Sequence, residues 1–276
     1  MPVTIIKAWT DVQASSTTHI VLMEIVLLGS GNIATHLGKA LKMAGQNISQ
    51  VWSRNNEKAT ELADAVGAVP VSELSEVSYS ADLYILAVND DAIRSVAEQI
   101  SISDGLLVHT SGTTGLDVLD GIAGRTGVFY PVQTFSKSKA VDLRKVPIAV
   151  EGSSPEVTNT LHSLASRISE KVMSMDSVQR RTVHVAAVFA CNFTNHMYVL
   201  ANKLLADQHL DFDLLRPLIA ETALKIQTAE PASVQTGPAV RDDQSTMDKH
   251  LELLADDPAL SELYGKLSQS IINYQK

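Results

Sequence analysis

A glycine-rich turn between an apolar run and a helical pattern is the clearest indication of chemistry in the sequence. Gly29 permits a tight turn, and Gly31 has no side chain to block an approaching diphosphate. The start of the following helix offers unpaired N–H groups and the positive end of a dipole. We therefore predict a cofactor-binding turn, rather than a plain connection, made of Gly29, Ser30, Gly31, Asn32, Ile33 and Ala34.

The end of the second predicted strand indicates which nucleotide such a turn would bind. A site that prefers NAD places Asp or Glu there to accept a hydrogen bond from the ribose 2′-hydroxyl. This sequence has no carboxylate before Glu57 and offers Ser53 and Arg54 instead. A guanidinium pairs well with a 2′-phosphate, so we expect NADP, with NAD as the alternative. The other interpretation makes Arg54 an ordinary solvated residue.

The loop after the predicted strand Leu83–Val88 lies where open α/β sheets bind their ligands. We assign Val88 and Asn89 to the cofactor, with Asn89 beside the nicotinamide ribose. Asp90 or Asp91 is expected to cap the helix that follows.

The loop after the predicted strand Leu106–His109 holds a further group of candidates. His109 can donate a proton or polarise a substrate, and Ser111 can hydrogen-bond the cofactor. A buried structural histidine is the alternative for His109. Tyr130 ends the next strand, and we expect it to line either an active site or an ordinary packing loop.

Polar residues interrupt the apolar pattern of the first long helix. At 100° per residue His184 and Asn195 lie on one face, about 16 Å apart, and Asn192 lies about 80° away from His184. Asn192 and Asn195 either face a substrate or belong to a hydrogen-bond network between helices or subunits. For His184 we favour the network. Cys191 is expected to be a small core residue.

The segment from Gln235 to Asp243 is the one long functional-looking loop in the second half of the sequence. Thr236 and Arg241 can bind a substrate carboxylate or phosphate there. The alternative for Arg241 is a structural ion pair with Asp242, Asp243 or Glu221.

The elements that must position these residues alternate between strands and helices in the first half, which is typical of a parallel sheet. The predicted strands are Glu24–Leu28, Gln50–Trp52, Leu83–Val88, Leu106–His109, Gly127–Tyr130, Pro147–Val150 and Val172–Ser174. The predicted helices between them are Asn32–Ala44, Glu57–Val66, Asp91–Ile100 and Pro155–Ser169.

The second half has long helical patterns and no strand pattern. We predict helices over Ser177–Ala206, Asp211–Thr228, Gln244–Ala255 and Ala259–Tyr274, with a break in the Pro- and Gly-containing segment Glu230–Asp243. The predicted fold is a Rossmann-like, doubly wound parallel sheet followed by an all-helical domain. The predicted boundaries are an N-terminal extension over 1–22, an NAD(P)-binding domain over 23–176 and a helical domain over 177–276.

Composition narrows the function classes. The 276 residues include 22 basic and 31 acidic side chains, a net charge of −9, which argues against a nucleic-acid partner. One cysteine excludes an intrachain disulfide and any Cys-rich metal site, so we expect no metal and a cytoplasmic location. No apolar run approaches the roughly 18 residues of a membrane span.

Five segments together resemble a known family. They are GSGNIATHLG at 29–38, HTSG at 109–112, GVFYPVQTFS at 127–136, HVAAVFACNFTNH at 184–196 and TGPAVRDD at 236–243. Through them the chain resembles, over about residues 23–275, NADP oxidoreductases that pair a Rossmann domain with a helical domain of unknown function. That group belongs to the superfamily of 6-phosphogluconate dehydrogenase and pyrroline-5-carboxylate reductase.

The resemblance implies a nucleotide-binding oxidoreductase that dimerises through its helical domain. β-Hydroxyacid dehydrogenases of this superfamily carry a helical lysine four residues before an asparagine, but Val188 and Cys191 occupy those positions here. We expect hydride transfer between NADP and an unidentified small carbonyl, imine or hydroxy substrate, with catalytic roles for His109, Asn192, Asn195, Thr236 and Arg241. The alternative is a non-catalytic NADP(H)-binding sensor or structural protein.

Overall fold

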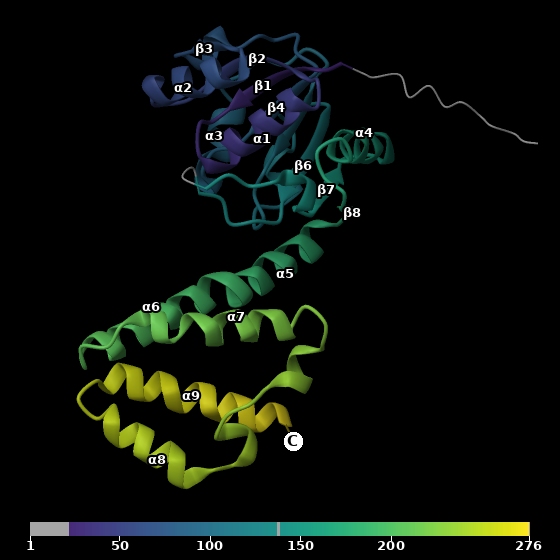
Figure 1. Ribbon diagram of the computed structural model, residues 1–276. Coiled ribbons are helices and arrows are strands. Elements are labelled where there is room, and N and C mark those ends of the chain that lie inside the picture. The colour runs from purple at the N-terminus through teal and green to yellow at the C-terminus, as the bar shows by residue number, and fades with distance from the viewer. Residues whose placement is uncertain (1–21, 137–138, 276) are drawn as a thin grey trace, which may run out of the picture. The chain divides into compact units, whose positions relative to one another are not determined.

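The computed structural model describes residues 22–136 and 139–275, and the chain forms two compact units, Met1–Asn195 and His196–Lys276 (Figure 1). The first unit is an α/β domain, and the second is helical. The two units divide after residue 195, whereas the domain boundary predicted from the sequence lies at residue 176. Apart from Leu22, the proposed N-terminal extension lies outside the described residues.

The first unit is built on an eight-stranded sheet with the order β3-β2-β1-β4-β5-β6-β7-β8. Neighbouring strands are parallel except β6 and β7, which are antiparallel. The predicted Rossmann-like fold is therefore confirmed, with a sheet that is mostly rather than entirely parallel. The strands are β1 (Glu24–Leu28), β2 (Asn47–Trp52), β3 (Val69–Val71), β4 (Leu83–Leu86), β5 (Leu106–His109), β6 (Arg125–Pro131), β7 (Ile148–Gly152) and β8 (Val172–Ser174).

The departures from the prediction lie at the two sides of the sheet. The sequence did not indicate β3, because this edge strand has three residues and its middle one is Pro70. Strand β7 runs antiparallel to β6. The described residues of the connection between them contain the short 3-10 helix η4 (Leu143–Lys145) and no α-helical crossover of the kind that parallel strands need.

The sheet is buried on both faces. In β1, Ile25 and Leu27 point to one face, Val26 and Leu28 point to the other, and all four are inaccessible to solvent. Helices α1, α2 and α4 pack on the first face, and α3 with η3 packs on the second. The bounds are α1 (Asn32–Met43), α2 (Asn56–Val66), α3 (Ile93–Ala97), α4 (Pro155–Ala165), η1 (Leu74–Glu76), η2 (Asp90–Ala92) and η3 (Leu116–Leu119).

The turn from β1 into α1 requires glycine at its first position. Gly29 has a φ of +129°, and a Cβ there would lie 2.2 Å from the backbone oxygen of Ala87. The turn therefore passes close over the end of β4. Ala34, five residues later, is fully buried against the sheet, as the motif predicts.

The long helix predicted over Ser177–Ala206 contains a wider turn. It consists of α5 (Ser177–Ala187), a π-helix η5 (Val188–Phe193) and α6 (Thr194–Ala206). The hydroxyl of Thr194 donates to the carbonyl of Phe189, five residues back, at 3.1 Å. The angles predicted for an ideal α-helix beyond residue 187 therefore do not apply. Cys191 lies in the π-helix and is exposed, so the prediction of a core residue is wrong.

The second unit contains the rest of α6 and three further helices. The predicted helix Asp211–Thr228 is shortened to η6 (Phe212–Leu214) and α7 (Arg216–Lys225). The predicted break is confirmed, with only η7 (Pro231–Val234) and η8 (Ala239–Arg241) in that segment. The chain ends with α8 (Gln244–Leu253) and α9 (Pro258–Gln275). Among the described residues, none of the helices has the length and apolar character of a membrane span.

Candidate active site

Helix α1 differs from α2, α4 and α5 (Ser177–Ala187) in how its N-terminus is completed. The side chains of Asn55, Ser154 and Asp176 cap α2, α4 and α5 by accepting hydrogen bonds from first-turn N–H groups. Helix α1 has no such cap and no acidic residue in its first turn. A Cβ added to Gly31 would meet no described atom within 4 Å. Open space in front of uncapped N–H groups fits a diphosphate.

The side chains of the turn are held by the protein. The amide nitrogen of Asn32 donates to the carbonyl of Phe135 at 2.8 Å, and the ring of His36 stacks on Phe135 with 5.1 Å between the ring centroids. Ile33 is half-buried. Asn32 and Ile33 can therefore contribute to cofactor binding through their backbone N–H groups, not through their side chains.

The loop after β2 presents a free cation. The hydroxyl of Ser30 donates to Ser53 Oγ at 2.8 Å, and the N–H of Asn55 also donates to that oxygen at 3.3 Å. The hydroxyl hydrogen of Ser53 is left to donate to another acceptor. Arg54 is exposed and has no ion pair within the described part of the chain. This pair of side chains fits a phosphate group.

The loops after β4 and β5 are tied together by hydroxyl–carboxylate hydrogen bonds. The Asp90 carboxylate accepts from Ser111 Oγ at 2.8 Å and from the Thr113 hydroxyl. Ser111 Oγ accepts from the N–H groups of Thr113 and Thr114 at 3.1 and 2.9 Å. The expectation that Asp90 or Asp91 caps the next helix is wrong, because η2 begins without a side-chain cap.

These hydrogen bonds determine which polar groups of the two loops remain available to a ligand. Ser111 is 7 % exposed, and its hydroxyl is engaged within the protein. Val88 is half-buried and Asn89 is exposed, with no side-chain hydrogen bond among the described residues. Of the three residues assigned to the cofactor at these strand ends, Asn89 is the one whose polar group is free.

His109 is completely buried. Its Nδ1 accepts the N–H of Ser111 at 3.2 Å, and its Nε2 has no hydrogen-bond partner in the described part of the chain. Burial first, and the charge of Arg180 second, lower the pKa of His109 to about 4. The imidazole is therefore neutral and out of reach of solvent, which favours the structural alternative over direct contact with a substrate.

A buried arginine on α5 holds the β5 loop in place. The Arg180 side chain is 1 % exposed and forms an ion pair with Glu151 on β7. Its Nε donates to the carbonyl of Ser111 at 3.2 Å, and another nitrogen donates to the carbonyl of Thr114. Ser177 completes the cluster by donating to Glu151 at 2.8 Å. Each of the three guanidinium nitrogens thus donates to an oxygen of the protein. Arg180 therefore stabilises the fold.

Tyr130 and His184 meet one helical turn further along α5. The Tyr130 hydroxyl lies 3.1 Å from His184 Nδ1. A Cβ on Gly112 would lie 2.6 Å from that nitrogen and 2.9 Å from the hydroxyl oxygen. The glycine of the HTSG segment therefore lets the β5 loop lie directly against this pair.

The remaining predicted residues are exposed, and their side chains have no hydrogen bond or ion pair with another described residue. Asn192 and Asn195 lie on the π-helix and at the start of α6 in the first unit. Thr236 and Arg241 lie in the second unit, and Arg241 has no ion pair with a described residue. Within the described residues neither Asp242, Asp243 nor Glu221 forms an ion pair with Arg241, and Asp243 caps α8 by accepting from the N–H of Thr246.

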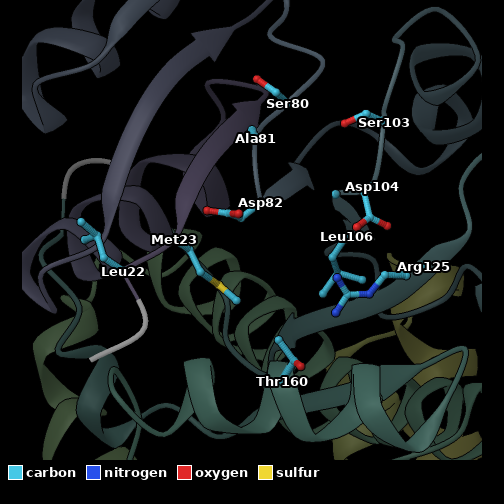
Figure 2. A pocket seen from close by; sticks show the side chains of 11 residues that line it. Leu22, Met23, Ser80, Ala81, Asp82, Ser103, Asp104, Leu106, Arg125 and Thr160 are labelled. Carbon is cyan, nitrogen blue, oxygen red and sulfur yellow. The ribbon is translucent and has the colours of Figure 1, made fainter. Parts of the chain in front are cut away.

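A depression of about 230 Å³ lies at the opposite edge of the sheet (Figure 2). Its rim contains Asp82, Asp104 and Arg125, which precede or begin β4, β5 and β6. These are the amino ends of parallel strands, whereas ligands of open α/β sheets bind beyond the carboxyl ends. This depression is therefore not the candidate cofactor site.

Sequence reasoning missed the cluster around Arg180. The capping pair Asp176 and Gln179 marks the start of α5 in the sequence and places Arg180 in its first turn. Glu151 follows an apolar strand, which is a signal for a buried charge that needs a partner. Nothing in the sequence indicates that these two charges, 29 residues apart, form a pair.

The sheet order, the uncapped α1 N-terminus and the glycine turn after β1 define a Rossmann-type dinucleotide-binding domain. Residues 24–111 match the family described as NADP oxidoreductase, coenzyme F420-dependent. Residues 146–271 match a domain of unknown function, DUF2520. No curated protein matches the chain.

Solved structures support the same assignment. A Bacteroides fragilis protein provisionally named an NADP oxidoreductase is 46 % identical, with a TM-score of 0.85 over 91 % of this chain and 98 % of that one. The chain therefore belongs to this family of NADP oxidoreductases, and the resemblance noted in the sequence is confirmed.

Two more distant structures share the fold. A 1-pyrroline-5-carboxylate reductase from Streptococcus pyogenes is 14 % identical, with a TM-score of 0.62 over 91 % of this chain and 99 % of that one. An imine reductase from Myxococcus stipitatus, solved with NADP+, is also 14 % identical, with a TM-score of 0.62 over 91 % and 92 %.

We predict that His109 makes folding stability depend on pH. Because its folded pKa of about 4 lies below the ordinary 6.5, the unfolded chain takes up the proton first as the pH falls. The stabilisation is complete above about pH 6.5 and is lost toward pH 4, a loss of about 3 kcal/mol. Urea unfolding at several pH values measures it.

The matched variant is His109→Asn, whose side-chain oxygen can still accept the Ser111 N–H but does not titrate. Its unfolding free energy should fall less between pH 7 and pH 4.5 than that of the wild type. Equal pH dependence in both proteins would contradict the assignment.

Proposed function

We propose that the protein is an NADP-dependent oxidoreductase that transfers a hydride between the nicotinamide and a small imine, carbonyl or hydroxy compound. The observation that carries this proposal is the uncapped N-terminus of α1, with open space at Gly31 and the unpaired guanidinium of Arg54 in the next loop. The relative that is 46 % identical, provisionally named an NADP oxidoreductase, supports it.

In this proposal the backbone of the glycine turn holds the diphosphate, and Ser53 with Arg54 holds the 2′-phosphate. Asn89 contacts the nicotinamide ribose. The bound cofactor supplies the hydride, while the protein orients the substrate and manages the accompanying proton. Because His109 is buried, its role is to hold the N–H of Ser111 and thus the β5 loop.

The reactions named for the structural relatives suggest a class of substrate, but not one particular compound. An imine reductase and a pyrroline-5-carboxylate reductase share the fold, which favours a carbon–nitrogen double bond as the hydride acceptor. We assign substrate orientation to the exposed polar residues Asn192 and Asn195 in the first unit, and we keep Thr236 and Arg241 in the second unit as separate candidates.

Oxidation of NADPH in the presence of a panel of small imines, ketones and aldehydes tests the proposed reaction. We expect at least one cyclic imine or ketone to make NADPH disappear faster than it does without substrate, as measured by the absorbance of NADPH. Tight NADPH binding with no turnover across the panel would instead indicate a nucleotide sensor. Failure to bind NADPH would contradict both.

The preference for NADP depends on one exposed cation. Replacing Arg54 with alanine should raise the Kd for NADPH about 10- to 100-fold and leave the Kd for NADH within about twofold, because only NADPH carries the 2′-phosphate. Calorimetric titration measures both constants. Lys171→Ala, which removes the same charge at the β8 edge of the sheet, is the matched control. Equal losses for both nucleotides would contradict the assignment.

We further propose that the second unit pairs with a second copy of the chain. Large apolar side chains on its helices are exposed, including Leu218 at 63 % and Leu253 at 79 %. Exposed apolar surface of this extent is typical of an interface. Sedimentation equilibrium should give twice the 29.7 kDa of one chain, and a mass of 29.7 kDa at micromolar concentration would contradict a dimer.

A further inference from the structure

The order of the strands determines which side of the sheet receives the reactive end of the cofactor. The glycine turn follows β1, and Arg54 follows β2. If the diphosphate and the 2′-phosphate bind there, the adenosine half lies on the β2 side of the switch point between β1 and β4. The nicotinamide half then extends to the other side, toward the loops that follow β4 and β5.

The Tyr130–His184 pair is a cluster of titratable groups that lies against the loop after β5. A Cβ added to Gly112 of the β5 loop would lie 2.6 Å from His184 Nδ1 and 2.7 Å from the Tyr130 ring, so this loop lies directly against both rings. Tyr130 is 7 % exposed, whereas His184 is half-buried. The histidine is thus the member of the pair that reaches toward solvent.

The chemistry of the two side chains assigns them different roles. Burial raises the pKa of Tyr130 above its ordinary value of 10, so its phenol keeps its proton at neutral pH and is a weak acid. Imidazole exchanges protons in the physiological range and is the commonest general acid. A phenol oxygen that accepts from Nδ1–H fixes the neutral imidazole in the tautomer with its hydrogen on Nδ1, which leaves Nε2 free to take up and give a proton.

We propose that His184 is the proton donor of the hydride-transfer reaction and that Tyr130 is the residue that positions its imidazole. This inference rests on the proposed function. The hydride adds to the carbon of a C=N or C=O bond, and the Nε2 proton of the His184 imidazolium goes to the nitrogen or oxygen. NADPH becomes NADP+, the imidazole becomes neutral, and water returns its proton.

The charges around the pair are compatible with this role. Arg180 lies four residues before His184 on the same face of α5, but its charge is compensated by Glu151. Asp90 is engaged by two hydroxyl groups. No carboxylate among the described residues forms an ion pair with His184.

Nuclear magnetic resonance of the imidazole rings in the full chain tests the placement without any turnover. In two-bond ¹H–¹⁵N spectra the neutral His184 ring should carry its hydrogen on Nδ1, and Tyr130→Phe should increase the Nε2–H form. Saturating NADP+ should shift the His184 ring signals. His162, an exposed histidine on α4, is the control whose signals should stay in place.

Kinetics with a substrate found in the panel test the chemical role. His184→Asn should lower kcat about 10²- to 10⁴-fold with an unchanged Kd for NADPH. Tyr130→Phe should lower kcat by about tenfold with little change in KM. Added imidazole should restore part of the activity of His184→Ala, which a purely structural role would not allow. His162→Asn should retain the wild-type rate.

The outcomes separate the two levels of the proposal. Wild-type turnover with an unaffected His184→Asn variant overturns the assignment of the proton donor and leaves the oxidoreductase function standing. If the His184 ring signals do not shift when NADP+ binds, the pair does not lie beside the nicotinamide, and this result holds even if no substrate has been found. A chain that binds no NADPH overturns the proposed function itself.

Discussion

A charged group in the interior must be paired, and in this protein that requirement organises the candidate active site. Arg180 is almost completely buried, and its guanidinium reaches Glu151 on β7 and two carbonyls of the β5 loop. Removing one partner of such a pair leaves an uncompensated buried charge, which typically costs about 3–5 kcal/mol. The pair therefore fixes the start of α5 against the carboxyl ends of the strands, and it sets the position of the HTSG loop.

The rest of the site follows from that loop. Its serine binds Asp90 and so ties the loops after β4 and β5 together. Its glycine allows Tyr130 and His184 to approach the backbone closely. On the other side of β4 the site has a different character, because the turn after β1 is open and its N–H groups are uncapped. One part of the sheet edge thus suits a phosphate, and the other holds the Tyr130–His184 pair.

The sequence was sufficient to predict those elements whose structure depends on neighbouring residues in the chain. Strands β1, β5 and β8 have their predicted bounds because each is a short apolar or β-rich run with clear ends, and the glycine turn was identified from its spacing alone. The π-helix and the exposure of Cys191 were not predictable from an ideal 3.6-residue period. The burial of His109, the Arg180–Glu151 pair and the contact between Tyr130 and His184 join distant segments, so they depend on packing that no local pattern reveals.

Hydrogen–deuterium exchange with and without NADPH tests the central claim that the cofactor binds at the carboxyl ends of β1, β4 and β5. The account predicts slower exchange in peptides that cover residues 29–36 and 109–115 when NADPH is present. Protection confined to residues 80–82 and 103–106, around the depression at the opposite edge of the sheet, would contradict it.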